Sequence, residues 1–168
     1  MAEEALVTAI HHNAEAIAAA FERAPEIVRE EIEAGVYEAS LLLERLVVEK
    51  TPTSGAGTLR ESIGALPVVF TGAAWEGGVG TALAYAAPVE EGSKPHMPPL
   101  APLMDWVKRR LGVAPDEIEG VAQAIAWKIF HEGTKAHHMF RDGFRAGEPQ
   151  VREILAGRID TALARIAA

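Results

Sequence analysis

Four histidines in the second half of the chain are the residues whose chemistry is easiest to name. They are His96, His131, His137 and His138, and Glu132 adds a carboxylate beside them. Imidazole and carboxylate groups bind zinc, but helical zinc motifs place two ligands four residues apart on one face. That paired spacing is missing, and the four histidines lie in or beside expected loops. We therefore expect no metal site, and we keep a small metal- or ligand-binding domain as an alternative.

The remaining candidates for catalysis or chelation are two further histidines and three serines. His11 and His12 are adjacent, so they point to different sides of a helix and cannot chelate an ion together. Ser54, Ser62 and Ser93 have no nucleophile-elbow context, and no recognisable motif places a pair of carboxylates. The sequence therefore predicts neither enzymatic activity nor a cofactor.

The glycine-rich stretch Gly77–Trp106 reads GGVGTALAYAAPVEEGSKPHMPPLAPLMDW. A second stretch, Gly133–Phe140, also contains a Gly-Thr dipeptide before an aromatic residue. Glycine-rich runs can hold phosphate, but the phosphate-binding signature needs a Lys-Ser/Thr pair at a set spacing, and none follows here. Instead of a phosphate cradle we expect a strand end and an acidic turn at Val89-Glu-Glu-Gly92.

Composition bounds the class of protein. The chain has 168 residues, 49% hydrophobic and 24% charged, which is typical of one soluble globular domain. Its net charge of −8 argues against a general basic surface that wraps nucleic acid, and the lack of cysteine excludes disulfides. The acidic N-terminus does not resemble a secretory signal, and no apolar run approaches the roughly 18 residues of a membrane span. We expect a protein made and kept in a cytoplasm, with no membrane partner.

The elements that position these residues divide the single expected domain, residues 1–168, into three segments. An N-terminal helical arm covers residues 1–50, with a break at Ala24-Pro25, because proline suits the first turn of a second helix. A loop and strand region covers residues 51–97, and C-terminal helices cover residues 98–168. The fold class is therefore α+β.

Alternating apolar residues predict a small antiparallel sheet, a hairpin around residues 62–81 that packs with several helices. Leu66, Val68 and Phe70 lie on its first strand, Thr71-Gly-Ala-Ala is the turn, and the second strand starts at Trp75.

The C-terminal segment predicts three helices. A proline-rich segment, residues 94–99, leads to the helix of Trp106, which ends near Gly112. The second helix opens with Ala114-Pro115-Asp116-Glu117, with proline at an early position, and ends at Gly133. The third is expected to start at Glu148-Pro149.

The order of several short motifs resembles a known family. A Thr-Pro loop leads to Gly-x-Leu-Arg-x-Ser, then come Val-Gly-Thr at the end of a strand, Tyr-Ala, and Val-Glu-Glu-Gly. These are followed by a Pro-Pro segment, a Leu-x-x-Trp-Val helix, and Gly-Thr and Met-Phe motifs. This order is similar to the tail-completion (neck) proteins of long-tailed phages, which include relatives of the lambda-like minor tail protein Z. It covers a little over half of the chain, from Thr51 to Phe144. Family members usually carry an aromatic residue before the last glycine, where this chain has Glu91 before Gly92.

The resemblance implies a virion structural protein of the head–tail junction. Such a protein oligomerises as a ring near the top of the tail tube, contacts neighbouring neck or tail proteins, and acts in tail completion and head–tail joining. DNA would only pass through its lumen, and assembly would take place in the host cytoplasm before the protein resides in the virion. The expected anchors of the core or of subunit contacts are Leu59, Tyr85, Val89, Glu90, Trp106 and Phe140.

Two further hypotheses stay open beside this one. A tail terminator-type ring protein that caps the tail tube fits the same resemblance. The cluster Lys108-Arg109-Arg110 suggests a DNA-contacting regulator or packaging factor, although such a run more often solvates one face of a helix.

Overall fold

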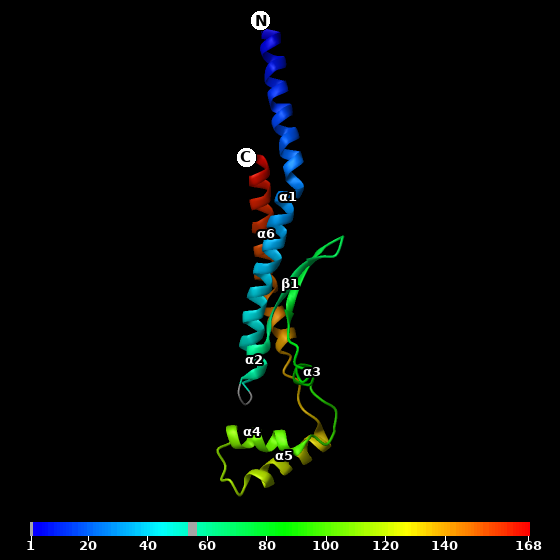
Figure 1. Ribbon diagram of the computed structural model, residues 1–168, viewed down its shortest axis with the longest axis vertical. Helices are drawn as coiled ribbons and strands as arrows, with labels where there is room; N and C mark the ends of the chain where they lie inside the picture. Colours follow the sequence, from blue (N-terminus) through cyan, green and yellow to red (C-terminus); the bar gives the residue numbers. More distant parts are fainter. Residues whose placement is uncertain (1, 54–56) are drawn as a thin grey trace. The chain divides into compact units, whose positions relative to one another are not determined.

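The computed structural model of the protein describes residues 2–53 and 57–168, with side chains described from residue 15 onward. The described chain is mostly helical, with one antiparallel two-stranded sheet, so the α+β prediction is confirmed. Figure 1 shows the order of the elements along the chain. They are α1 (Ala2–Lys50), α2 (Thr58–Ser62), β1 (Gly64–Phe70), β2 (Trp75–Gly80), α3 (Ala86–Glu91), α4 (Leu100–Arg110), α5 (Ile118–Glu132) and α6 (Met139–Ala167).

The chain forms two compact units, each built from several stretches. Unit 1 comprises Met1–Ser40, Pro67–Gly78 and Glu148–Ala168. Unit 2 comprises Leu41–Leu66 and Val79–Gly147. Helices α1 and α6 and both strands contribute residues to both units. The prediction of one domain for residues 1–168 stays a prediction.

In unit 1, α1 packs against α6 on one side and against the hairpin on another. A Cβ atom on Gly35 of α1 would lie 2.9 Å from Cγ of Arg158 and 3.3 Å from Cδ2 of Leu155, both on α6. A Cβ atom on Gly77 of β2 would lie 2.6 Å from Val36 of α1. Glycine therefore sits at both crossings, because a side chain there would push the elements apart.

In unit 2, the same two helices approach each other at two further glycines. Gly143 and Gly147 lie four residues apart, on one face of α6. A Cβ atom on Gly143 would lie 2.8 Å from Cγ2 of Val47, and one on Gly147 would lie 2.7 Å from Cδ2 of Leu43. These contacts bring the α6 backbone against the buried face of α1, where Val47 is fully buried.

Two predicted helix boundaries at prolines are wrong. Helix α1 runs without a break through Pro25, and α6 starts at Met139 and contains Pro149 in its interior. An internal proline removes one backbone hydrogen bond and costs about 3 kcal/mol. Pro25 and Pro149 are both exposed, which lets water reach the carbonyl that loses its donor, and strong helix formers continue on each side. The 24–25 and 148–149 dipeptides therefore do not mark helix starts.

The other boundaries follow the predictions more closely. The hairpin turns at Thr71–Ala74, where the Thr71 N–H donates to the Ala74 carbonyl oxygen at 2.9 Å. Gly112 and Gly133 follow the ends of α4 and α5 with φ of 60° and 73°, values that favour glycine. The segment expected as an acidic turn around Val89 is instead the helix α3, which ends at Glu91.

Candidate functional site

The two stretches that the sequence singles out meet in unit 2. Ser93 follows the Val-Glu-Glu-Gly motif, Thr134 follows Gly133, and the two form an isolated antiparallel β-bridge. Each N–H donates to the carbonyl oxygen of the other residue at 3.1 Å, and the Thr134 hydroxyl donates to Ser93 Oγ at 2.9 Å. The polar atoms of Ser93 and Thr134 are thus used within the chain. We call this contact the glycine junction, because Gly92 and Gly133 precede its two residues.

The glycines allow the two backbones of the glycine junction to touch. A Cβ atom on Gly133 would lie 2.0 Å from the Ser93 carbonyl oxygen, and one on Gly92 would lie 2.5 Å from the Thr134 carbonyl oxygen. Both glycines also have positive φ, 76° at Gly92 and 73° at Gly133. Their function in the fold is close backbone packing.

Glu90 joins α3 to the beginning of α6. Its two carboxylate oxygens accept hydrogen bonds from the backbone N–H groups of Phe140 at 2.9 Å and Arg141 at 3.0 Å. The first N–H groups of a helix have no partner inside it, and a carboxylate there also interacts favourably with the helix dipole. The preceding turn is held as well, because Val89 and Glu90 carbonyl oxygens accept from His137 and His138 at 2.9 and 3.0 Å.

A small apolar core lies beside these hydrogen bonds. Leu59, Ala86 and Met139 are buried together, and Leu83, Val89 and Phe140 pack against them. Four of the six predicted anchor residues therefore lie at or next to one cluster: Leu59, Val89, Glu90 and Phe140.

The other two predicted anchors lie elsewhere. Tyr85 precedes α3 and is 46% exposed. Trp106 is half-buried in α4, and its neighbour Val107 is the residue of that helix that is fully buried. Met139 and Val107 belong to the Met-Phe and Trp-Val motifs but were not among the predicted anchors, although each stands next to an aromatic residue that was.

The Gly-x-Leu-Arg-x-Ser motif connects the end of α1 to the hairpin. Arg60 donates from Nε to the Val48 carbonyl oxygen at 3.0 Å, which satisfies an acceptor in the last turn of α1. The Ser62 hydroxyl donates to the Leu59 carbonyl oxygen at 2.8 Å and lies 2.7 Å from the Thr81 hydroxyl. Arg60 and Ser62 of this motif therefore make hydrogen bonds within the chain.

The histidines whose side chains the structure describes are not gathered into a ligand set. Among the side chains that the structure describes, no group of three or more His, Asp or Glu residues is placed to hold a metal ion. His131 stacks on Trp127 with ring centroids 5.9 Å apart, and His96 Nδ1 lies 2.9 Å from the Lys94 carbonyl oxygen. The side chains of His11 and His12, and all of Ser54, lie outside the described residues.

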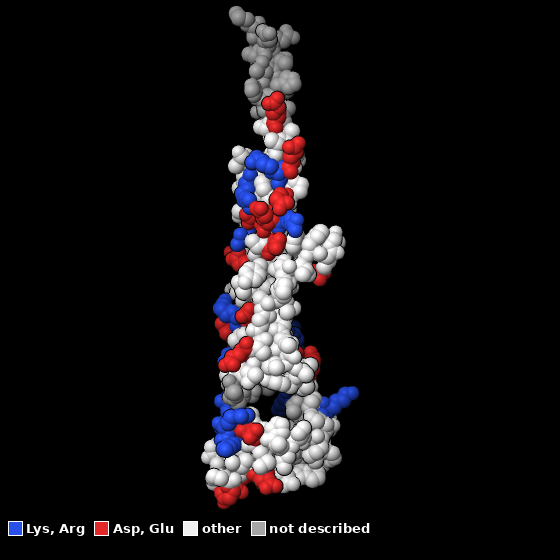
Figure 2. Space-filling view, viewed as in Figure 1, with Lys and Arg blue, Asp and Glu red and all other residues white. Residues whose placement is uncertain are grey.

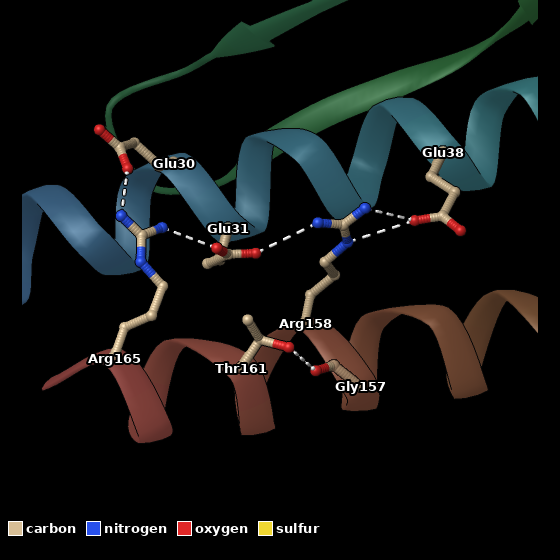
Figure 3. A network of polar contacts seen from close by, with 7 residues as sticks. All are labelled: Glu30, Glu31, Glu38, Gly157, Arg158, Thr161 and Arg165. Carbon is tan, nitrogen blue, oxygen red and sulfur yellow. Dashed lines mark hydrogen bonds and ion pairs between the residues drawn. The ribbon is translucent and has the colours of Figure 1, made fainter. Parts of the chain in front are cut away.

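Unit 1 holds the main charged network, shown in Figure 3. Arg158 and Arg165 of α6 both bind Glu31 of α1, at 3.2 and 2.7 Å. Arg158 also binds Glu38 at 2.7 Å, and Arg165 binds Glu30 at 2.8 Å.

These contacts shift the ionisation of the network. The pKa of Glu31 is lowered, chiefly by its hydrogen bond from Arg165 and then by that from Arg158. The pKa of Arg158 is raised by Glu38 first, and the pKa of Arg165 by Glu30 first. The network thus holds α1 and α6 together as ionised partners at neutral pH.

The basic run of α4 has one internal partner. Arg110 donates from Nη2 to the Thr53 carbonyl oxygen, and Lys108, Arg109 and Arg110 are all exposed. One of the three cations that suggested DNA contact therefore has a partner within unit 2.

Comparison of the chain with models of protein families, with curated proteins and with solved structures finds no match. Among the described residues, no helix combines the length and the apolar composition that crossing a bilayer requires.

Proposed function

We propose that the protein is a structural component of a phage particle at the head–tail junction, which acts by oligomerising near the top of the tail tube. In this proposal it completes the tail and contacts neighbouring neck or tail proteins. It has no catalytic role and no cofactor. The order of motifs from Thr51 to Phe144 supports the choice of family, and the structure adds one observation in favour of self-assembly.

That observation is the balance of buried and exposed apolar side chains. Among the described residues, sixteen large hydrophobic side chains are exposed, whereas eleven hydrophobic residues are buried and five of those are alanines. Single exposed apolar residues are ordinary, but a chain that exposes more large apolar side chains than it buries has surface to cover. Subunit contacts are the simplest way to cover it.

The polar residues of the candidate site agree with a structural role. Glu90, Ser93 and Thr134 are engaged in hydrogen bonds to the chain itself. A catalytic group needs a free hydrogen-bonding position toward its substrate. These residues are used instead to fix α3, α5 and α6, so the motifs that carry the resemblance stabilise a fold.

The net charge of −8 suits passage of DNA. An acidic lumen would repel phosphates and let the duplex slide without binding, whereas a basic one would retain it. A ring with Lys and Arg along its channel wall would contradict this part of the proposal.

Location in the particle tests the proposal directly. A gold-labelled antibody against the chain, applied to the tailed particles that contain it, should mark the junction of head and tail in electron micrographs. Labelling of the tail tip or of the capsid shell, or a failure to find the protein in purified particles, would contradict the proposal. Stoichiometric binding of zinc by the purified protein would support the ligand-binding alternative.

The mass of the native assembly is the second measurement. Multi-angle light scattering of the purified protein is expected to show an oligomer, and negative-stain images should show a ring. Because some tail proteins assemble only on a template, the same measurement is repeated with purified tails added.

A further inference from the structure

The tip of the hairpin in unit 1 is an uncharged apolar protrusion. No Asp, Glu, Lys or Arg occurs from Ser62 to Trp75, and Figure 2 shows this tip in white. Val69 and Phe70 are 51% and 56% exposed. A hydrophobic hairpin of this kind costs free energy in water unless another surface covers it.

The aromatic residues at the tip are held in place from one side. The rings of Phe70 and Trp75 lie 5.1 Å apart, and the Arg29 guanidinium of α1 lies 5.7 Å from the Trp75 ring. Trp75 is half-buried, whereas Phe70 projects into solvent. Phe70 is therefore a preorganised anchor, and preorganised aromatic residues contribute strongly to protein interfaces.

Unit 2 carries an apolar pocket with no occupant from the chain. It lies between the proline-rich segment and α5, with a volume of about 180 Å³. A cavity of about 150 Å³ is large enough for a benzene molecule, so this pocket can take a phenylalanine ring. Met97 and Trp127 line it and are half exposed, and methionine adapts its shape to an incoming ring. The full lining is Met97, Pro98, Leu100, Gln123, Ala126 and Trp127.

The charge of the two units indicates which surfaces can meet. Unit 1 contains 13 acidic and 5 basic residues and therefore carries −8, whereas unit 2 contains 11 of each and is neutral. Contact between two copies of unit 1 brings like charges together, and contact between unit 1 and unit 2 of different copies avoids this cost.

The residues next to the anchor and the pocket have opposite charges. Glu76 follows Trp75 on β2, directly after the uncharged tip, and Lys128 follows Trp127 at the pocket. Both are exposed. This arrangement favours an approach of the tip of one copy to the pocket of another.

We propose that the hairpin tip of one copy, with Phe70 as anchor, binds the pocket of unit 2 in a second copy. The contact is heterologous, because it joins two different surfaces, and a heterologous contact that closes generates a ring. The inference rests on the proposed self-assembly and names the surfaces that would produce it.

Pairwise cross-linking tests this contact without disturbing the protein. The chain has no cysteine, so single cysteines introduced as Val69→Cys and Gln123→Cys have no background. The two variants are mixed in equal amounts and oxidised, and the masses of the products are measured by intact mass spectrometry. The expected main product is the heterodimer of the two variants. A matched control replaces Gln123→Cys by Ala156→Cys, an exposed position on α6, and should give little heterodimer.

A mixture that forms no more heterodimer than the control overturns the inference. The proposed function is tested separately by location in the particle. If the heterodimer forms but the protein is absent from the head–tail junction, the proposed function is contradicted and the proposed contact is supported. If the protein is found at the junction but the cysteines do not pair, the proposed function is supported and the proposed contact is contradicted.

A substitution at the anchor gives a second measurement. Phe70→Glu places a charge in an apolar pocket, and we expect the concentration needed for assembly to rise ~10-fold or more. Leu163→Glu is the control, because Leu163 is similarly exposed, at 59%, on α6 of the same unit. Equal effects of the two variants would contradict a specific contact at Phe70, and circular dichroism checks that both remain folded.

Discussion

Units 1 and 2 are stabilised in different ways. In unit 1, long charged side chains join α1 to α6, and two arginines share Glu31 between them. In unit 2, backbones touch at Gly92 and Gly133, and a carboxylate accepts hydrogen bonds from the start of α6. Flexible side chains adjust to small changes, whereas backbone atoms in contact do not. We therefore expect unit 2 to be the more sensitive to single substitutions.

Charge separates the two units as well. The whole net charge of −8 resides in unit 1, and unit 2 is neutral. The motifs on which the proposed phage family rests fall mostly in unit 2, where they form internal contacts. Unit 2 therefore contains the close backbone contacts of Gly92 and Gly133, and unit 1 contains the net charge and the apolar hairpin tip.

The largest expected effect is at the glycine junction. Gly133→Ala should lower the free energy of unfolding by roughly 3–5 kcal/mol, because the new methyl group would overlap the Ser93 carbonyl oxygen and the residue has positive φ. Gly112→Ala is the control, since Gly112 also has positive φ but open space around it, and should cost only about 1–2 kcal/mol. Urea denaturation followed by circular dichroism measures both. Equal losses would show that backbone strain, and not close approach, is what matters at Gly133.

Glu90 should come next. Glu90→Ala removes the acceptor for two N–H groups at the start of α6, and we expect a loss of about 1–3 kcal/mol. Glu91→Ala removes the neighbouring exposed carboxylate and should change stability by less than about 0.5 kcal/mol. Amide hydrogen exchange of Phe140 and Arg141 should accelerate in the first variant only. Unchanged exchange there would refute the capping role.

Two glycines of α6 allow the effect of an added methyl group on stability to be compared between the units within one helix. Gly143→Ala in unit 2 should destabilise the protein by about 1–2 kcal/mol, because its methyl group would press on Val47. Gly157→Ala in unit 1 meets open space and should stabilise it by about 0.5–1 kcal/mol, because alanine is the better helix former. Thermal and urea unfolding give the sign of each change. The same sign for both variants would contradict the packing of α6 on α1 in unit 2.

The smallest effect is expected from the charged network of unit 1, and it depends on pH. Arg165 and Arg158 lower the pKa of Glu31 from its ordinary value of 4.5. Its contribution to stability is therefore fully present above pH 4.5 and is lost as the pH falls below 4.5 through the lowered pKa of the folded state. Glu31→Gln should flatten the decline of the melting temperature in this range. If the melting temperature of Glu31→Gln falls with pH as steeply as that of the wild type, other carboxylates cause the decline.

Local sequence determined most of the element types. Alternating apolar residues and turn formers placed the hairpin around 62–81, and Gly133 marked the end of α5. The lack of charged residues from Ser62 to Trp75 is also a property of the sequence itself. These features depend on neighbours along the chain, which a sequence shows directly.

Tertiary contacts decided the rest. Whether Pro149 begins a helix or lies inside one depended on Glu90, fifty residues before Phe140, because that carboxylate stabilises an earlier start of α6. The sequence alone pointed to Gly92 and Gly133 as unusual, but only the folded chain brought them together. The reason is physical: a close backbone approach between distant segments leaves no periodic pattern, and glycine is compatible with many environments until its neighbours are known.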